Sequence, residues 1–384
     1  MKIVHLCISQ SYFDNWGYQE NLISSYQADM GHDVCVISTN KIYPNWLKKH
    51  EKELILSKGK EYFIDKVRII RLKAFRPLGT HVVFTYNLYK TLLKEKPDII
   101  FHHEPTNFST IICSIYKLLH PKITYFIDSH SDKLNSAGTK ISEWLYFKIF
   151  LRVMHKLIAP FVKYYYGVTP SRCDFLRTYI GIPNKKIKFL PIGCDTRTAS
   201  GIHSKENLRS VYNIPLKQLV VVSGGKMGKY KGTDSLITAV EELRQEGLDV
   251  SLILFGTFLD EESERLAKAK EWIQRYGWCD RIKSLELLKI ADIACWPIHH
   301  TTLNEDALAV GTPLVIRKTS TTEHLVGLNG EFLYNIGDIN EIKKSIRTIF
   351  GDLPKYQEET MNLSKKMSYY AISEIIIKDS HKKC

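Results

Sequence analysis

The sequence lacks the long apolar run that a membrane-spanning helix needs. Among its 384 residues, no stretch of about 18 is continuously apolar. The eight cysteines are scattered without a CxxC pair, so a zinc ribbon or a redox dithiol is not indicated, and we expect buried thiols in a reduced cytoplasm. The opening MKIVHLCISQ has one lysine and a short apolar run, which predicts a first strand rather than a signal peptide.

Standard signatures for nucleotides, metals and nucleic acids are also missing. Neither GxxxxGK[ST] nor GxGxxG occurs, which disfavours a Walker A loop and a standard dinucleotide fingerprint. The histidines and carboxylates of FHHEP (101–105) and FIDSHSD (126–132) match no standard ligand spacing, so we expect no metal. No nucleic-acid-binding module is recognisable, and nucleic acid is not expected as a partner.

Positive charge is present in excess, and it is confined to one half of the chain. Residues 1–200 hold 29 Lys and Arg against 16 Asp and Glu, whereas residues 201–384 hold 25 of each. A basic half beside a neutral half suggests that one domain meets an anionic partner, such as a membrane surface or a phosphate-bearing acceptor. The alternative is a charge that only maintains solubility.

The order of apolar and amphipathic segments predicts an α/β protein with two domains. Strands alternate with helices in both halves, which is typical of doubly wound parallel sheets, and the length exceeds the roughly 250–300 residues of a single core. We expect one domain over 1–195, a polar hinge over 196–216 and a second domain over 217–360. A helical tail over 361–384 is expected to cross back to the first domain.

Three local predictions are specific enough to test. The segment 260–277 (DEESERLAKAKEWIQRYG) is expected to be one helix, and 280–285 (DRIKSL) a short strand. The apolar and basic segment 143–167 is expected to be mostly a helix packed on the sheet. Its basic residues offer an alternative interpretation, a face for anionic lipid, formed by Lys148, Arg152, Lys156 and Lys163.

The segment SGGKMGKYKGTD (223–234) predicts a diphosphate site. It follows an apolar strand and opens a helix, its glycines allow a ligand to approach the backbone, and Lys226, Lys229 and Lys231 supply cations beside the helix N-terminus. The alternative is a solvated lysine loop.

Three further candidates are ambiguous from residue chemistry alone. Glu305 precedes the apolar run 307–310, where it can complement a helix dipole or accept hydrogen bonds from two neighbouring hydroxyls of a ribose. His130, at the end of a strand, can be structural or functional. Gly17, at the first strand-to-helix corner, is a weak signal.

Taken in order, these motifs resemble a known family. A strand with a glycine corner precedes a DxH strand end, VTPSRCDFLRTYIGIPNKKIKFLPIGCD, the glycine-lysine loop, NEDALAVGTPLV and EHLVGLNGEFLYNIGD. This succession resembles family 4 of the retaining, nucleotide-sugar-dependent glycosyltransferases. The resemblance implies the GT-B fold, in which two Rossmann-like domains face each other across a cleft.

The resemblance also implies a role for each matched residue. Lys226 and Lys231 correspond to the basic residues that hold the donor diphosphate, and Glu305 to the second glutamate of the Glu-x7-Glu motif, which binds the ribose. His130 corresponds to the histidine beside the transferred sugar. Gly17 corresponds to the corner that approaches the donor phosphate and the acceptor.

The chain departs from the family at the first glutamate of that motif. Position 297 is a proline, and the following segment is short. His299 or His300 is expected to take over contacts with the sugar. Backbone amides near Thr301 and Thr302 are expected to meet the phosphate.

The resulting expectation is a metal-independent, hexosyltransferase-type enzyme without a cofactor. Its co-substrate would be a UDP- or GDP-type sugar, and its acceptor either a free or a lipid-linked saccharide, as in surface-polysaccharide synthesis. The basic N-terminal domain would hold the enzyme at the inner face of an anionic membrane. Two alternatives are a non-catalytic GT-B protein, which binds a nucleotide or supports a partner enzyme, and a sugar-nucleotide epimerase.

Overall fold

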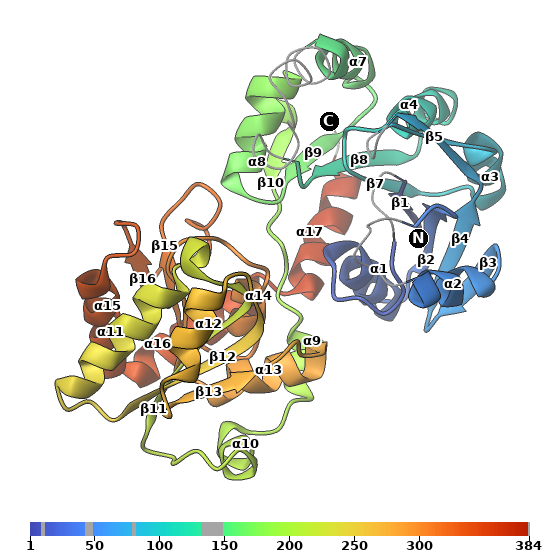
Figure 1. The fold of residues 1–384 in the computed structure, drawn as a ribbon. Coiled ribbons are helices and arrows are strands. Elements are labelled where there is room, and N and C mark those ends of the chain that lie inside the picture. The colour runs from blue at the N-terminus through green and yellow to red at the C-terminus, as the bar shows by residue number, and fades with distance from the viewer. Residues whose placement is uncertain (9–11, 43–48, 79–81, 132–148, 383–384) are drawn as a thin grey trace. The chain divides into compact units, whose positions relative to one another are not determined.

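A computed structural model describes residues 1–8, 12–42, 49–78, 82–131 and 149–382. The chain forms two compact units, one of Met1–Pro191 with Tyr369–Cys384 and one of Ile192–Ser368. Both are α/β units built on a largely parallel sheet (Figure 1). These two units confirm the predicted fold class, an α/β protein with two doubly wound domains.

The first unit contains an eight-stranded sheet in the order β10-β9-β8-β7-β1-β2-β4-β3. Every pairing is parallel except β3 with β4, and β5 and β6 form a separate antiparallel pair. The strands are β1 (Lys2–Cys7), β2 (Asp33–Thr39), β3 (Glu61–Ile64), β4 (Val67–Leu72), β5 (Ala74–Leu78), β6 (Val82–Thr85), β7 (Ile99–His103), β8 (Thr124–Ser129), β9 (Tyr164–Gly167) and β10 (Ile187–Phe189). Because the sheet is parallel, the carboxyl ends of β1, β7 and β8 lie at one edge.

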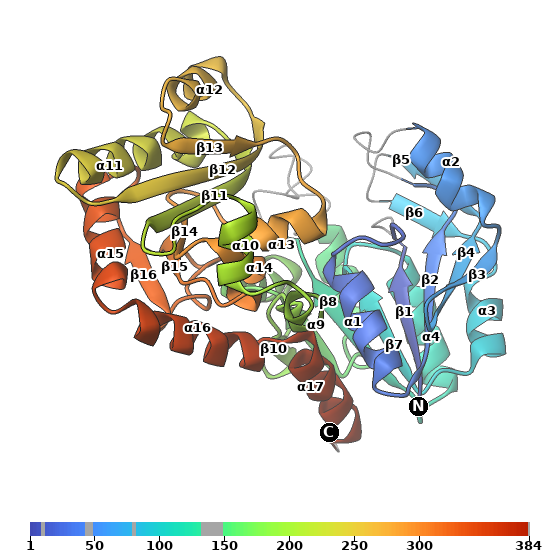
Figure 2. The same ribbon diagram turned by 90° about the horizontal axis from the view of Figure 1, so that it is seen from below.

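Helices cover both faces of this sheet, as the two views show (Figures 1 and 2). One apolar core joins the sheet to α3, α4 and α7, and the other joins it to α1 and α17. The helices are α1 (Gln19–Asp29), α2 (Lys49–Ser57), α3 (Leu88–Glu95), α4 (Ser109–Leu119), α7 (Arg152–Ile158), α8 (Pro170–Phe175), η2 (Leu176–Ile180), η3 (Asn184–Lys186) and α17 (Tyr369–His381). Both faces are therefore buried, which explains the continuous apolar runs of β1, β7 and β8.

The last helix, α17, packs into the first unit although it follows the second in sequence. Its Tyr369 ring lies 5.8 Å from that of Tyr26 in α1. Its Asp379 accepts hydrogen bonds from Tyr166 and Lys188, at 2.9 and 2.7 Å. The chain thus passes between the units twice, at Pro191–Ile192 and at Ser368–Tyr369.

The second unit contains a six-stranded, wholly parallel sheet in the order β13-β12-β11-β14-β15-β16. Its strands are β11 (Leu219–Met227), β12 (Val250–Phe258), β13 (Ile273–Tyr276), β14 (Ile293–Trp296), β15 (Leu314–Arg317) and β16 (Gly330–Leu333). Its helices are α9 (Thr196–Ser200), α10 (Lys205–Val211), η4 (Lys229–Lys231), α11 (Thr233–Gln245), α12 (Glu261–Lys268), α13 (Arg281–Ile290), α14 (Leu303–Ala309), α15 (Ile339–Gly351) and α16 (Leu353–Lys366). Two apolar cores lie on its opposite faces, one with α13 and α14 and one with α11 and α15.

Two local predictions in this unit are wrong. The segment 260–277 is not one helix, because α12 ends at Lys268 and Ile273–Tyr276 pairs with β12 as strand β13. The segment 280–285 is not a strand, because it opens helix α13. Asp280 caps that helix by accepting a hydrogen bond from the Lys283 amide at 2.8 Å, a start signal that the sequence reading overlooked.

The apolar segment 143–167 is helical in part. Helix α7 ends at Ile158 and Tyr164–Gly167 form β9. Residues 143–148, with Lys148, lie outside the described residues. No helix within the described ranges is long and apolar enough to cross a membrane.

Candidate functional site

Polar side chains gather at the carboxyl edge of the first sheet. His103 ends β7 and Asp128 lies next to it near the end of β8. A chain of hydrogen bonds runs inward from them: His103 Nδ1 lies 2.8 Å from Asp128 Oδ2, and His103 Nε2 lies 3.1 Å from His5 Nδ1. His5 Nε2 then lies 2.8 Å from the Gln27 amide oxygen in α1. All four side chains are buried.

Proton counting allows two arrangements of this chain. If the Gln27 oxygen faces His5, each imidazole donates inward, and His103 needs a second proton to donate to Asp128 as well. If the Gln27 amide is turned, every imidazole is neutral and each donates outward towards Asp128. Burial and the neighbouring His103 lower the pKa of His5 to about 3, so His5 itself stays neutral in either case.

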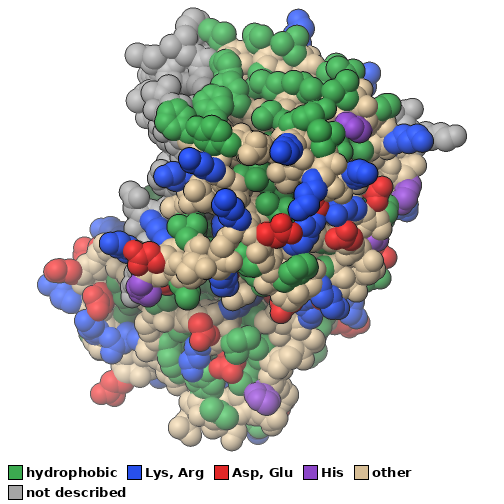
Figure 3. All heavy atoms as spheres, turned by 90° about the vertical axis from the view of Figure 1, so that its right-hand side faces the viewer, with side chains coloured by type: hydrophobic (Ala, Val, Ile, Leu, Met, Phe, Trp, Pro, Cys, Tyr) green, Lys and Arg blue, Asp and Glu red, His purple; other side chains and the backbone are tan. Residues whose placement is uncertain are grey.

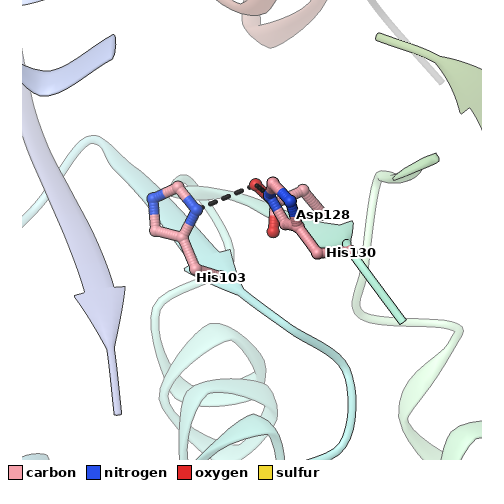
Figure 4. A group of neighbouring side chains, drawn as sticks. All are labelled: His103, Asp128 and His130. Carbon is pink, nitrogen blue, oxygen red and sulfur yellow. Dashed lines mark hydrogen bonds and ion pairs between the residues drawn. The ribbon is translucent and has the colours of Figure 1, made fainter. Parts of the chain in front are cut away.

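His130 follows β8 and lies beside the same carboxylate. Its Nε2 is 3.5 Å from Asp128 Oδ2, and Figure 4 shows the hydrogen bond that joins His103 to the same carboxylate. Burial alone lowers the pKa of His130, but attraction to the carboxylates of Asp128, Glu104 and Glu20 outweighs it and the net shift is upward. His103 and His130 conversely hold the pKa of Asp128 well below its usual range, against the effect of burial. Carboxylates thus lie around a protonatable imidazole at this edge.

Backbone and side-chain bonds hold His130 in this position. Its amide donates to Glu104 Oε2 at 3.1 Å, and its carbonyl accepts from Arg172 Nε at 2.8 Å. Glu104 has a left-handed backbone with φ of 78°, an uncommon conformation for a residue with a side chain. The bonds from the His130 amide and the Ser131 hydroxyl to its carboxylate tie that turn to the end of β8.

Three ligand atoms in this cluster lie close enough for a metal ion. One atom each of His103, Asp128 and His130 fall within 4.8 Å of one another. Both His103 nitrogens already have hydrogen-bond partners, so an ion would have to displace the bond to Asp128. Asp132, which the sequence reading placed beside His130, lies outside the described residues.

Gly17 lies in the exposed corner between β1 and α1, two residues ahead of the helix. The sequence reading missed the two polar residues that follow it, Gln19 and Glu20. Both are buried, and among the described residues the Gln19 amide has no hydrogen-bond partner on either atom. The signal for them was two polar residues in the first turn of a helix that starts at a strand end.

Lys226 and Lys231 lie at the carboxyl edge of the second sheet. Lys226 is still part of β11, where it pairs with Thr257 of β12, and Lys231 ends the turn that leads into α11. Gly228 and Gly232 adopt φ of 149° and 78°, so glycine serves the turn at both positions. Burial and the charge of Lys226 lower the pKa of Lys231.

A third cation, Arg317, completes this group and was missed from the sequence. It ends β15, and the charges of Lys231 and Arg317, together with burial, lower the pKa of His299. The His299 ring lies 4.3 Å from that of Tyr230. Within the described ranges, none of the cations Lys226, Lys231 and Arg317 forms an ion pair with a carboxylate. The sequence feature that could have predicted Arg317 is a basic residue at the end of the apolar strand PLVIR (313–317).

Glu305 lies in the first turn of α14 and is 2% exposed. Its Oε1 is 3.0 Å from His300 Nε2, while its Oε2 is buried without a hydrogen-bond partner among the described residues. The amide of Thr301 donates to the Asn304 side chain at 3.0 Å, and Thr302 precedes the helix without a side-chain cap. A buried carboxylate oxygen without a donor is costly, which is typical of a site that a ligand completes.

The proline at position 297 has a packing partner. A Cβ added at Gly232 would lie 3.0 Å from Pro297 Cβ and 2.9 Å from Ile298 Cγ1. Pro297 therefore lies against the start of α11. The residue that departs from the family motif supports the turn that carries Lys231.

Two glycosyltransferase family models match the chain, one in each half. The family model described as Glycosyltransferase Family 4 matches residues 21–198, and the one described as Glycosyl transferases group 1 matches residues 204–373. A processive diacylglycerol beta-glucosyltransferase of Staphylococcus aureus (strain JH9) is 26% identical over 154 residues, 40% of this chain and 33% of that protein. The match thus spans about a third of the length of this relative.

Solved structures resemble the chain over nearly its full length. A glycosyltransferase from Rickettsia africae ESF-5 has a TM-score of 0.68 at 14% identity, covering 99% of this chain and 97% of that one. Anabaena Alr3699/HepE in complex with UDP has a TM-score of 0.65 at 18% identity, covering 98% and 99%. At such identities the likeness shows the fold, which is GT-B.

Proposed function

Because the chain belongs to the glycosyltransferases that these two family models describe, we propose that it moves a sugar from a nucleotide-diphosphate sugar to an acceptor hydroxyl with retention of configuration. The observation that carries the proposal is the group of polar side chains at the carboxyl edge of the second sheet, which lack partners among the described residues. There, three cations without carboxylate partners accompany a buried carboxylate with one unpartnered oxygen. This combination suits a nucleoside diphosphate, which brings phosphate charge and ribose hydroxyls together.

In this proposal the cations act on the leaving diphosphate. Lys226, Lys231 and Arg317 stabilise the negative charge that develops as the bond to the sugar breaks, and the N-terminus of α11 adds its dipole. Such stabilisation is often the largest catalytic contribution, and losing one contact costs roughly 10²–10³ in rate. These charges would serve in place of a metal ion.

Glu305 is the proposed ribose ligand. His300 lies within hydrogen-bond distance of one of its oxygens, which fixes the carboxylate, and the other oxygen is available to accept a hydrogen bond from a ribose hydroxyl. The donor nucleotide is proposed to be UDP or GDP, and the Anabaena structure in complex with UDP supports UDP. His299 remains the candidate for contacts with the transferred sugar.

His130 is proposed to contact the transferred sugar from the first unit, with Gly17 at the corner that meets the donor and the acceptor. The upward shift of its pKa favours the imidazolium, which can donate to a sugar hydroxyl. Asp128 and His103 orient the ring but lie too deep to be proposed as ligands.

The acceptor is proposed to be lipid-linked, in surface-polysaccharide synthesis at the cytoplasmic face of a membrane. The name of the Staphylococcus aureus relative, a diacylglycerol glucosyltransferase, supports a lipid acceptor. The excess of basic residues in 1–200 supports an anionic surface as a partner.

The test is release of free nucleotide from a panel of UDP- and GDP-sugars, first without and then with lipid acceptors. We expect slow hydrolysis of at least one donor, unaffected by a metal chelator. Nuclear magnetic resonance of the product then reports the anomeric configuration, and an inverted anomer would refute retention.

A second candidate function rests on Pro297. Without the first motif glutamate, the protein could bind a nucleotide and support a partner enzyme without catalysis. Binding of UDP or GDP with no turnover of any donor in the panel would favour this alternative. Conversion of a donor to its epimer without an acceptor would favour an epimerase.

A further inference from the structure

Two neighbouring helices of the first unit present large apolar side chains that the described residues leave exposed. On α4 the exposed residues Ile115, Leu118 and Leu119 form one helical stripe, with the two leucines 58% and 60% exposed. On α7 and the turn before it, four more large apolar side chains are exposed: Ile149, Phe150, Val153 and Leu157. Their spacing of three and four residues puts them on one side of that helix.

Aromatic contacts join the two stripes into one surface, which we call the α4–α7 face. The Phe108 ring, at the start of α4, lies 5.3 Å from that of Phe150 and 5.0 Å from that of Phe84 in β6. The apolar area extends over the upper part of Figure 3, within the first unit. Large contiguous apolar patches are uncommon on a monomeric protein and mark interaction sites.

The two segments that carry this face hold basic residues and no acidic ones. Residues 105–127 and 144–173 contain no Asp or Glu, although the whole chain averages roughly one per nine residues. Figure 3 likewise shows blue but no red side chains in its upper third. The exposed cations beside the face are Lys122, Arg152 and Lys156.

Two lysines of these segments do not belong to the face. Lys117 donates to the carbonyls of Pro121 and Ile123, at 2.7 and 2.6 Å. Lys163 lies beyond α7 and donates to the carbonyls of Ser380 and Lys382. The basic face predicted from sequence, where Lys163 was included, therefore reduces to Arg152 and Lys156 among the described residues.

We infer that the α4–α7 face docks on the surface of an anionic phospholipid bilayer. Aliphatic side chains would enter the boundary between headgroups and acyl chains while the lysines and the arginine contact the lipid phosphates. The lack of carboxylates in these two segments favours a lipid surface over a protein partner, whose own surface normally carries both signs. The inference rests on the proposed function. Docking on the bilayer would bring the enzyme to its lipid-linked acceptor.

The first experiment measures co-flotation of the full chain with vesicles. We expect binding to vesicles of phosphatidylcholine with roughly 30% phosphatidylglycerol, because the negative surface potential of anionic lipids attracts basic segments. The double variant Leu118→Gln/Leu157→Gln should lower the partition at least about tenfold. The matched control is Val211→Gln/Leu216→Gln, at two residues of the second unit that are 75% and 65% exposed. It should bind as the wild type does.

The second experiment separates the charge from the apolar contact. Lys122→Glu/Lys156→Glu should abolish the preference for phosphatidylglycerol, whereas Lys217→Glu/Lys355→Glu, on the second unit, should leave it intact. Raising the salt concentration should weaken the binding of the wild type.

Three results would overturn the inference. They are no binding of the wild type to anionic vesicles, equal binding by the Leu118→Gln/Leu157→Gln variant, or a dimer in solution that this variant dissociates. Donor hydrolysis measured without vesicles keeps this test separate from the proposed function. Vesicle binding without any hydrolysis would refute the enzyme and leave the docking surface standing.

Discussion

The candidate sites of the two units carry opposite charge. In each case the charge at the site differs from the net charge of that half of the sequence. The half with 29 basic and 16 acidic residues surrounds His130 with the carboxylates of Asp128, Glu104 and Glu20. The neutral half gathers Lys226, Lys231 and Arg317 without carboxylate partners in the described ranges. The net charge of a domain therefore does not predict the charge of its site.

The sites also differ in whether their polar side chains have hydrogen-bond partners within the protein. In the first unit, hydrogen bonds join Gln27, His5, His103 and Asp128 in one buried chain. In the second unit, Glu305 Oε2 lacks a donor among the described residues. The first arrangement is a fixed scaffold around one side chain, and the second is a set of groups that a ligand would complete. The following predictions test this difference.

The largest effect is expected from Asp128→Asn. It removes a buried charge that two histidines face, and breaking a buried pair costs about 3–5 kcal/mol of unfolding free energy. Chemical denaturation measures it. The control is Asp174→Asn, whose carboxylate is 57% exposed beside Arg177 and should change the stability little. Equal stability of the two variants would show that the chain is not a fixed scaffold.

Lys231→Ala should act on activity rather than on stability. Loss of one cation at the leaving diphosphate is expected to lower donor turnover by roughly 10²–10³. Thermal unfolding should change little, because Lys231 has no carboxylate partner in the part of the chain that the structure describes. Lys229→Ala, two residues earlier and exposed, is the control and should keep most of the activity. Full activity of both variants would point to a solvated lysine loop.

Glu305→Gln should separate binding from folding in the second unit. A hydrogen bond to a charged group contributes about 1.5–3 kcal/mol, so nucleotide affinity should fall roughly 10–100-fold by calorimetry. The melting temperature should stay unchanged or rise, since a buried, unpartnered carboxylate oxygen is lost. Glu358→Gln, on the exposed side of α16, should change neither quantity. A marked loss of stability with unchanged affinity would assign Glu305 to the helix instead.

The smallest effect concerns the titration of His130. Its pKa in the folded protein is raised above 6.5, so its contribution to stability is complete below pH 6.5 and is lost as the pH rises through the raised pKa. Nuclear magnetic resonance of the histidine ring should show this pKa, and Asp128→Asn should lower it. Glu53→Gln on the surface helix α2 should leave it unchanged. A pKa at or below 6.5 in the wild type would mean that burial outweighs the carboxylates.

Much of the fold followed from local pattern, and the errors have local causes. The alternation of apolar strands and amphipathic helices predicted both sheets, because parallel strands buried on two faces must be continuously apolar. At 260–277 the short strand β13 was missed because its four residues have one buried position, Ile273, between exposed and half-buried neighbours. At 280–285 the segment was predicted to be a strand, although Asp280 is a residue type that commonly caps the start of a helix.

The candidate residues could be named from the sequence, but their partners could not. Strand ends and glycine turns are visible as local composition, and they pointed to His130, Lys226, Lys231 and Glu305. Arg317 and Glu20 were missed because a single basic or acidic residue at the end of an element is common. Only their neighbours in space distinguish them from ordinary surface charges.

The sequence alone determined the two sheets, the edges where polar groups follow apolar strands, and the family that this succession of motifs resembles. These depend on residues near one another in the chain. Only the tertiary structure decided that His5 and Gln27 support His103, that Pro297 packs on Gly232, and that one Glu305 oxygen stays without a donor in the described residues. It also decided that the exposed apolar residues of α4 and α7 share one face. Contacts between residues 22 to 98 positions apart, such as those of His5, depend on how strands are ordered in a sheet, and that order leaves no mark in a local pattern.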